Sequence, residues 1–247
     1  GNSNTVMMPS FMSTAGDADG IFNDEDADIL YQLNRTDNVI NAYSNVNDSL
    51  AVGGTPQLSA TSSSDFSNGR EIAVVGNKLV VAQDANSDNG DTNRLIVYDI
   101  SPGAIVLDKT FDVAINLWGI FLSNNTLYAI IDNSSDVAIF DNFLNLPAGT
   151  ISPDQTVRIE NMVRTHGITY DAEDDLMVLT DVGDAASDID GALVVGRNFT
   201  TAGADGTVTM SEQTRVAGGS SQMGNPVDVA LDKENNRIYV AERARDG

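Results

Sequence analysis

The chain has no cysteine, one histidine and three lysines among its 247 residues. Because cysteine is absent, no disulfide stabilises the fold and the redox compartment cannot be read from the sequence. A single histidine excludes a metal centre built on a histidine cluster or pair. No run approaches 18 consecutive apolar residues, so we predict no membrane span. The length allows one large domain that buries about 70–75% of its unfolded surface.

Positive charge is also scarce. The chain carries 13 basic and 36 acidic residues, which gives a net charge of −23. Such a surface repels phosphate groups, and this argues against a nucleic-acid partner or an anionic membrane surface. An excess of carboxylates instead favours cation binding or high solubility.

The first ten residues, GNSNTVMMPS, contain neither an initiator Met nor the apolar core of a secretion signal. We interpret Gly1 as the scar of a tag on a chain from which a targeting segment was removed. This interpretation predicts an exported bacterial protein, located in the periplasm, on the cell surface or outside the cell, or anchored as a lipoprotein.

What the chain does have is an internal repeat. Similar segments begin at Asp19, Arg70, Trp118, His166 and Val227, separated by 51, 48, 48 and 61 residues. Each segment contains an apolar strand, a polar turn and a second apolar strand. A third strand follows in the first four segments, and a fourth follows in some of them. Four strands per 40–50 residues, without an amphipathic helix, are typical of a β-propeller blade.

We therefore predict an all-β chain that forms one β-propeller domain over residues 1–247, built from four-stranded antiparallel blades. Continuous apolar runs such as LYAII fit strands that are packed on both faces by neighbouring blades. A β-sandwich is the alternative, but it does not explain two successive spacings of 48 residues. The fifth repeat stops after its second strand, so the last blade is expected to be incomplete.

The last repeat, NPVDVALDKENNRIYVAE (225–242), resembles the NHL repeat, in which a proline and a glycine-isoleucine-alanine-valine-aspartate strand precede isoleucine-tyrosine-valine-alanine-aspartate. It is equally similar to the YVTN-type repeats of bacterial propellers. The resemblance implies a ring of six or seven blades, and residues 1–16 would supply a ring-closing outer strand. Propellers of this kind include ligand-binding modules, protein-interaction platforms and some lactonases and lyases.

Two acidic loops are candidate calcium sites. The stretch DANSDNGD (84–91) resembles an EF-hand loop, but it lacks glycine at loop position 6 and glutamate at position 12. Turns between second and third strands open on one face of a propeller, which we call the loop face. A cation there would be held by oxygens of Asp84, Asn86, Asp88 and Asp91, or in the second loop by those of Asp181, Asp184, Asp188 and Asp190.

The calcium interpretation has a simpler competitor. Counted from the leucine that begins each second strand, Asp84, Asp132 and Asp181 occupy the same position. An aspartate that ends a strand before a turn is favoured because it accepts hydrogen bonds from the turn backbone. This structural role competes with Ca²⁺ binding at every one of these loops.

The residues that begin the five first strands form the second candidate site. Blade geometry predicts that they surround the mouth of the central channel, where a ligand site would combine a stacking surface with polar groups. The predicted ligand-binding residues are Asp19, Arg70, Trp118, His166 and Asp228. The competing interpretation is that Trp118 packs between blades and that His166 is a satisfied channel-lining residue.

Two functions remain open. The first is a non-enzymatic binding module outside the cytoplasm that presents its loop face to a protein or glycan. The alternative is a metal-dependent hydrolase or lyase similar to gluconolactonase-type propellers, with Asp19 and Asp228 near the ion and His166 as the base. A Ser-His-Asp triad would also require His166, and the chain has no Gly-x-Ser-x-Gly motif. The chain could also be one domain of a larger cell-surface protein.

Overall fold

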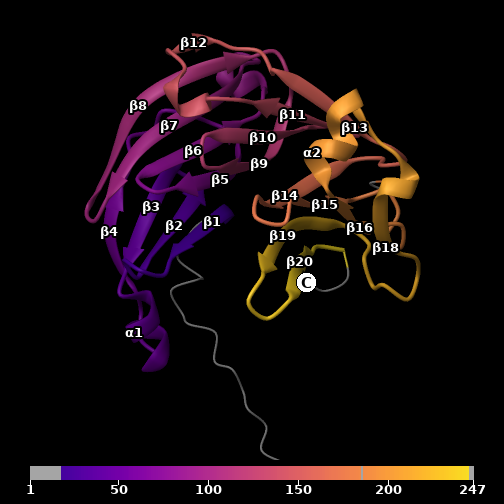
Figure 1. Cartoon of the computed structure of the whole chain (residues 1–247). Helices are drawn as coiled ribbons and strands as arrows, with labels where there is room; N and C mark the ends of the chain where they lie inside the picture. Colours follow the sequence, from indigo (N-terminus) through magenta and orange to yellow (C-terminus); the bar gives the residue numbers. More distant parts are fainter. Residues whose placement is uncertain (1–17, 185, 245–247) are drawn as a thin grey trace, which may run out of the picture.

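The computed structural model describes residues 18–184 and 186–244, which form five β-sheets around a common centre (Figure 1). The sheets follow one another in chain order. The first sheet contains β1 (Ala18–Asp24), β2 (Ile29–Asn34), β3 (Val39–Ser44) and β4 (Gln57–Thr61). The second contains β5 (Gly69–Val75), β6 (Lys78–Gln83), β7 (Asn93–Ser101) and β8 (Ala104–Val113).

The third and fourth sheets repeat this order, and the fifth has two strands. The third contains β9 (Leu117–Ser123), β10 (Thr126–Ile131), β11 (Asp136–Phe140) and β13 (Gln155–Ile159). The fourth contains β14 (Thr165–Asp171), β15 (Leu176–Asp181), β16 (Ala192–Arg197) and β18 (Gln213–Ala217). The fifth is the hairpin of β19 (Pro226–Asp232) and β20 (Arg237–Glu242).

Short helices lie only in the connections of the described chain. Helix α1 (Val46–Ala51) projects between β3 and β4, and α2 (Phe199–Ala202) follows β16 (Figure 1). The 3-10 turns are η2 (Ser87–Asn89), η3 (Phe143–Asn145), η4 (Gly203–Asp205) and η5 (Met210–Glu212). No helix of the described residues has both the length and the hydropathy needed to cross a bilayer.

Two very short strands connect neighbouring sheets at the outer rim. Strand β12 (Gly149–Thr150) lies in the connection that follows β11, yet it pairs in parallel with β8 of the second sheet. Strand β17 (Thr207–Val208) lies in the connection that follows β16 and pairs in parallel with β13 of the third sheet. Each connection thus extends the preceding sheet before the chain continues.

The hydrophobic core consists of layers between adjacent sheets. Tyr98 and Leu33 lie in the layer between the first and second sheets, and Phe111 and Phe140 lie in the layer between the second and third. These side chains are fully buried. Strands covered on both faces need apolar residues at consecutive positions, which explains runs such as LVVA in β6. The packing of sheet on sheet sets the position of every first strand around the centre.

This architecture confirms the prediction of an all-β propeller with four-stranded antiparallel blades. Four such blades are present, and the fifth repeat forms a two-stranded sheet. A ring of six or seven blades is not established by this arrangement. The ring-closing strand predicted for residues 1–16 lies outside the described residues.

Candidate functional site

An irregularity in strand pairing occurs at the start of all five first strands. In each hairpin the register shifts there, and the residues skipped by regular pairing include the residue that begins each repeat. They include Asp19, Arg70, Trp118, His166 and Val227. A β-bulge bends its strand and redirects a side chain. In each sheet, the irregularity therefore turns one side chain away from the direction that regular alternation along the strand would give it.

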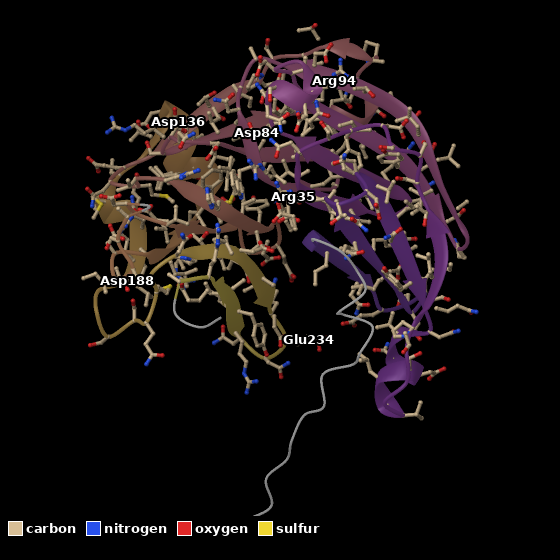
Figure 2. All side chains as sticks on the ribbon, turned by 180° about the vertical axis from the view of Figure 1, so that it is seen from behind. Arg35, Asp84, Arg94, Asp136, Asp188 and Glu234 are labelled. Carbon is tan, nitrogen blue, oxygen red and sulfur yellow. The ribbon has the colours of Figure 1, made fainter. Side chains whose placement is uncertain are left out.

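Most of these residues line one cavity of about 370 Å³. Its walls come from the first, second, third and fifth sheets. The lining residues are Asp19, Arg35, Arg70, Glu71, Trp118, Val227, Asp228 and Arg243. Four of the predicted ligand-binding residues are thus brought together, and we call this space the mouth cavity. In Figure 2, Arg35 lies near the centre of the ring, whereas Arg94 lies at its outer edge.

His166 does not line the mouth cavity but lies behind Trp118. The two rings are parallel, with centroids 3.9 Å apart and an interplanar angle of 3°. The Cζ atom of Arg70 lies 4.0 Å from the centroid of the same indole. Two groups at such short distances from one ring must occupy opposite faces. Both faces of Trp118 are therefore covered, so this indole joins three sheets and offers a ligand its edge rather than a stacking face.

The stack is surrounded by ionisable groups. Nη2 of Arg70 lies 3.5 Å from Oδ2 of Asp84, and Nε of Arg164 lies 3.4 Å from Oδ1 of Asp132. Burial raises the pKa of Asp84, although Arg70 opposes the change. Burial also acts against ionisation of Asp132, but His166 and Arg164 hold the pKa of its carboxyl below the ordinary value. These carboxylates form ion pairs with Arg70, which lines the mouth cavity, and with Arg164, which does not line it.

His166 is kept neutral by its surroundings. Burial lowers the pKa of its imidazole, and the nearby positive charge of Arg164 adds to this effect. Its Nε2 atom lies 3.7 Å from Oδ1 of Asp132, which is beyond hydrogen-bond distance. Both ring nitrogens lack a hydrogen-bond partner among the described residues. The geometry gives His166 a packing role in the stack, and it does not place His166 beside the mouth cavity as a base.

At the next position along each first strand, the backbones of neighbouring first strands lie very close together. A Cβ atom on Gly119 would overlap the backbone oxygen of His166, and one on Gly167 would lie 2.8 Å from Cα of Asp228. Glycine at this position lets neighbouring first strands come together. The second and fifth sheets instead carry Glu71 and Asp228 there. Two carboxyl groups consequently enter the channel where other sheets have no side chain.

Their environment favours the protonated forms. Burial, followed by the charge of Asp228, raises the pKa of Glu71 well above its ordinary value. Burial raises the pKa of Asp228 to about 6, with a smaller contribution from Asp19. Both carboxyls also border a second cavity of about 390 Å³, which continues along the first strands between side chains such as Ile72 and Ile168. They mark the boundary between the polar mouth cavity and this more apolar part of the channel.

Three residues of the mouth cavity were not predicted from the sequence: Arg35, Glu71 and Arg243. Arg35 and Arg243 directly follow the second strands of their sheets, at the position that Asp84 and Asp132 hold elsewhere. The sequence does contain a clue to the two arginines, because Arg35 and Arg243 each lie 16 residues after the first residue of their repeat, Asp19 and Val227. The side chain of Arg35 lies 3.7 Å from Asp19, measured from Nε to Oδ2.

The loop at 84–91 is held by hydrogen bonds of its two asparagine side chains, Asn86 and Asn89. Oδ1 of Asn86 accepts hydrogen bonds from the backbone N–H groups of Asp88 and Asn89. Asn89 in turn accepts from the backbone N–H of Asn86 and donates to the backbone oxygen of Asp84. The Asp84 carboxylate faces Arg70, and Asp91 has a left-handed φ of 56°. Hydrogen bonds within the loop therefore close it. The side-chain oxygen of Asn86, which was predicted to bind Ca²⁺, is already used as an acceptor in these bonds.

The loop at 181–190 is organised around a buried carboxylate. Asp181, which is 1% exposed, accepts hydrogen bonds from the backbone N–H groups of Val163, Arg164 and Gly183. Arg215 donates to it as well, at 3.1 Å. Further along this loop, Asp184 accepts from Ala186, Asp190 accepts from the backbone of Asp184, and Asp188 is also engaged. Among the described residues, no group of three or more His, Asp or Glu side chains is placed to hold a metal ion.

One expectation about these loops is wrong. Asp181 pairs with Thr165 within the hairpin, whereas Asp84 lies one residue beyond the pairing of Gln83 with Gly69. Asp84, Asp132 and Asp181 therefore do not share one position. The reason is that the leucines used for counting are not equivalent: Leu176 pairs with Asp171 at the end of β14, whereas Leu79 pairs with Val74, one residue before the end of β5. Leu176 is the first residue of β15, whereas Leu79 is the second residue of β6.

Comparison with known proteins identifies the fold. No family model and no curated protein sequence matches the chain, so the NHL or YVTN assignment has no support from family models. A chain in a crystal structure of a nidogen–laminin complex aligns with a TM-score of 0.57 and 15% identity, over 92% of this chain and 73% of that one. At such identity the likeness concerns the fold alone.

Two further structures agree. The β-propeller domain of Cps50 (Swd1) from Myceliophteria thermophila aligns with a TM-score of 0.57 and 12% identity, over 92% of this chain and 62% of that one. This chain therefore spans less than two thirds of that structure. A Bacteroides fragilis protein assigned as a 6-phosphogluconolactonase aligns with a TM-score of 0.56 and 14% identity, over 91% of this chain and 76% of that one. The chain is a β-propeller.

Proposed function

We propose that this β-propeller is a non-enzymatic binding module that acts outside the cytoplasm and holds a protein or glycan ligand at the mouth of its channel. One observation carries the proposal: side chains from four sheets converge on the mouth cavity, which combines charged groups of both signs with an indole edge. A few convergent polar groups in a concave space are the usual form of a ligand site. The cavity opens on the loop face, where the connections of the blades can add contacts.

The proposal for the partner draws on chemistry and on fold likeness. One structure with the same fold was solved as a nidogen–laminin complex, which is a protein–protein complex. The net charge of −23 disfavours nucleic acid, as argued from the sequence. We also propose that the chain is exported, that its repeats are of the NHL or YVTN type, and that the complete ring has six or seven blades. An experimental structure of the full-length protein would test the number of blades.

Binding can be tested by screening labelled protein against glycan and extracellular-protein panels, followed by titration of any hit. The informative variant is Arg70→Gln, which removes a positive charge from the mouth cavity and the guanidinium that lies over one face of the Trp118 indole. Arg94→Gln is the matched control, because Arg94 pairs with Asp112 at 2.8 Å on an exposed part of the second sheet. We expect Arg70→Gln to weaken binding and Arg94→Gln to leave it unchanged. Equal affinity of the two variants for every hit would refute a ligand site at the channel mouth.

A second candidate is hydrolysis of a lactone. The observation that favours it is the pair of carboxyls in one channel, since Asp228 has a pKa of about 6 and Glu71 a pKa raised well above its ordinary value. Such a pair can include one proton donor and one acceptor. The divalent ion of gluconolactonase-type propellers does not fit the described side chains, because no three carboxylates or histidines are grouped to hold it. We therefore derive no step through a metal.

The hydrolase candidate is tested with a lactone panel. Activity that disappears in Asp228→Asn while the fold is retained would support it. Activity that instead is lost in His166→Ala and requires an added divalent metal would support the metal-dependent hydrolase predicted from the sequence. A calcium ion bound at 84–91 or 181–190 stays a separate prediction, tested by comparing thermal stability in Ca²⁺ and in chelator.

A further inference from the structure

The distribution of arginine in this acidic chain singles out the mouth cavity. The chain has ten arginines and a net charge of −23. Three of these arginines, Arg35, Arg70 and Arg243, line the cavity, and they come from the first, second and fifth sheets. A fourth, Arg164, lies nearby, with Cζ 5.7 Å from the Trp118 centroid. A concentration of guanidinium groups from separate sheets is the pattern expected of a site that receives an anion.

Arg70 is held in position but keeps donors available. Its guanidinium carbon lies over the indole, and this contact holds the group at the wall of the mouth cavity. The one ion pair of its side chain among the described residues is with Asp84, at 3.5 Å. Its Nε atom is buried and has no hydrogen-bond partner among the described residues, so this donor is left unsatisfied. Arg243 is exposed, and its side chain forms no ion pair within the described part of the chain.

The carboxyls of the cavity restrict the anion. Asp19 and Asp228 would repel a doubly charged phosphate more strongly than a singly charged carboxylate. Carboxylates at such positions also accept hydrogen bonds from hydroxyl groups. Glu71 supports this arrangement, because burial raises the pKa of its side chain and the protonated form can donate a hydrogen bond. The site thus has donors for a carboxylate and acceptors for hydroxyls.

The size and polarity of the cavity narrow the ligand further. A volume of about 370 Å³ lies at the low end of the range for small-molecule sites, about 300–1,000 Å³. Val227 and the edge of Trp118 are the apolar parts of the lining. Because the indole faces are covered, a ligand that needs ring stacking or a large apolar pocket is disfavoured. A compact, hydroxyl-rich acid fits these constraints.

We propose that the mouth cavity binds an acidic sugar of the uronate class, with the sugar carboxylate on Arg70 and Arg243 and its hydroxyls on Asp19 and Asp228. This inference rests on the proposed binding function and names the ligand class for the same site. A uronate combines one negative charge with several hydroxyls in a single ring. A guanidinium matches the two oxygens of a carboxylate with two parallel N–H donors.

The test is calorimetric titration of the full chain with methyl glucuronide and methyl galacturonide. The matched ligands are methyl glucoside, which lacks the charge, and glucose 6-phosphate, which carries a phosphate. We expect at least one uronide to bind about tenfold or more tightly than either comparator, as is typical when a charge-assisted contact is lost. The affinity should also fall as salt rises, because part of the attraction is between partly exposed charges.

Variants connect this binding to the cavity. Arg70→Gln is expected to weaken uronide binding by about tenfold or more, and Arg70→Lys should recover only part of the loss because lysine lacks the planar fork. Arg94→Gln should bind as the wild type does. Circular dichroism and thermal melts check that each variant folds. If Arg70→Gln does not fold, Arg243→Gln replaces it, since this exposed side chain has no structural partner among the described residues.

Each other result overturns a definite part of the argument. Equal affinity for methyl glucoside and a uronide, or tighter binding of glucose 6-phosphate, would refute the carboxylate assignment but leave a glycan-binding module. Binding of an acidic peptide but of no sugar would refute the sugar and leave a protein-binding module. Uronide affinity that is the same in Arg70→Gln, Arg243→Gln and wild type would remove the site from the mouth cavity, and the proposed function would fall with it.

Discussion

The carboxyl of Asp228 makes a strong prediction about stability and pH. It enters the channel where other first strands have glycine, and burial raises its pKa from 3.8 to about 6. In the unfolded chain the side chain loses its proton near the ordinary value, whereas in the folded protein it keeps the proton up to a higher pH. Ionised Asp228 is therefore a cost of folding that increases as the pH rises through this interval.

The size of this cost follows from the shift. A difference of about two pKa units corresponds to about 3 kcal/mol at pH values above both pKa values, and to almost nothing below the unfolded value. Asn has a similar shape, can still accept the 2.8 Å hydrogen bond from the backbone N–H of Val229, and has no proton to lose. Asp228→Asn should therefore stabilise the folded state by up to about 3 kcal/mol at pH 8 and by little at pH 4.

The assay is urea unfolding of both proteins at intervals between pH 4 and pH 8. The control is Glu234→Gln, which removes a charge from the exposed turn of the same hairpin, seen at its tip in Figure 2. The stability difference between Asp228→Asn and wild type should grow mainly between pH 4 and pH 6, while that of the control should not follow this course. Parallel pH profiles for Asp228→Asn and wild type would refute the claim that a buried, proton-binding carboxyl lies in the channel.

Three further substitutions probe the stack and the close contacts around it. Trp118→Ala removes the middle layer of the stack and should cost about 3 kcal/mol, measured by urea unfolding with circular dichroism; an unchanged midpoint would mean that the stack contributes nothing. Asp181→Ala leaves three backbone N–H groups and an arginine without their buried acceptor and should cost about 3–5 kcal/mol by the same assay, with a milder loss for Asp181→Asn. Gly167→Ala places a Cβ atom 2.8 Å from the backbone of Asp228 and should lower the melting temperature, whereas Gly219→Ala, with no atom within 4 Å, should not.

The fold could be predicted from the sequence because its main signal is local and repeated. Each blade begins with two apolar strands around a turn of Asn, Asp or Gly, and this pattern recurs in all five repeats. The weaker fourth strands were harder to find. Strand β4 reads QLSAT and β13 reads QTVRI, with exposed residues that lack the apolar character of inner strands. Pairs of residues such as Gly149–Thr150 in β12 carry no sequence signal at all.

The candidate site was predicted only in part, for geometric reasons. The start of each first strand was located by counting, which brought Asp19, Arg70 and Trp118 to the right place. The counting then misplaced Asp181, because Leu176 is the first residue of β15 whereas Leu79 is the second residue of β6. The covering of both indole faces was not predictable, since it depends on how three sheets are spaced. Glu71 and Arg35 were missed because each looks like an ordinary polar residue until the strands are set side by side.

The short parallel strands at the rim have a consequence for aggregation and amide exchange. An uncovered outer strand presents unpaired N–H and C=O groups that can recruit a strand from another molecule. Part of that edge is covered on β8 by β12 and on β13 by β17, while no strand of the described chain covers the outer edges of β4 and β18. Deuterium should consequently enter β4 and β18 before the covered parts of β8 and β13. Those two exposed edges are also where a charged or proline substitution would do most to keep concentrated protein monomeric.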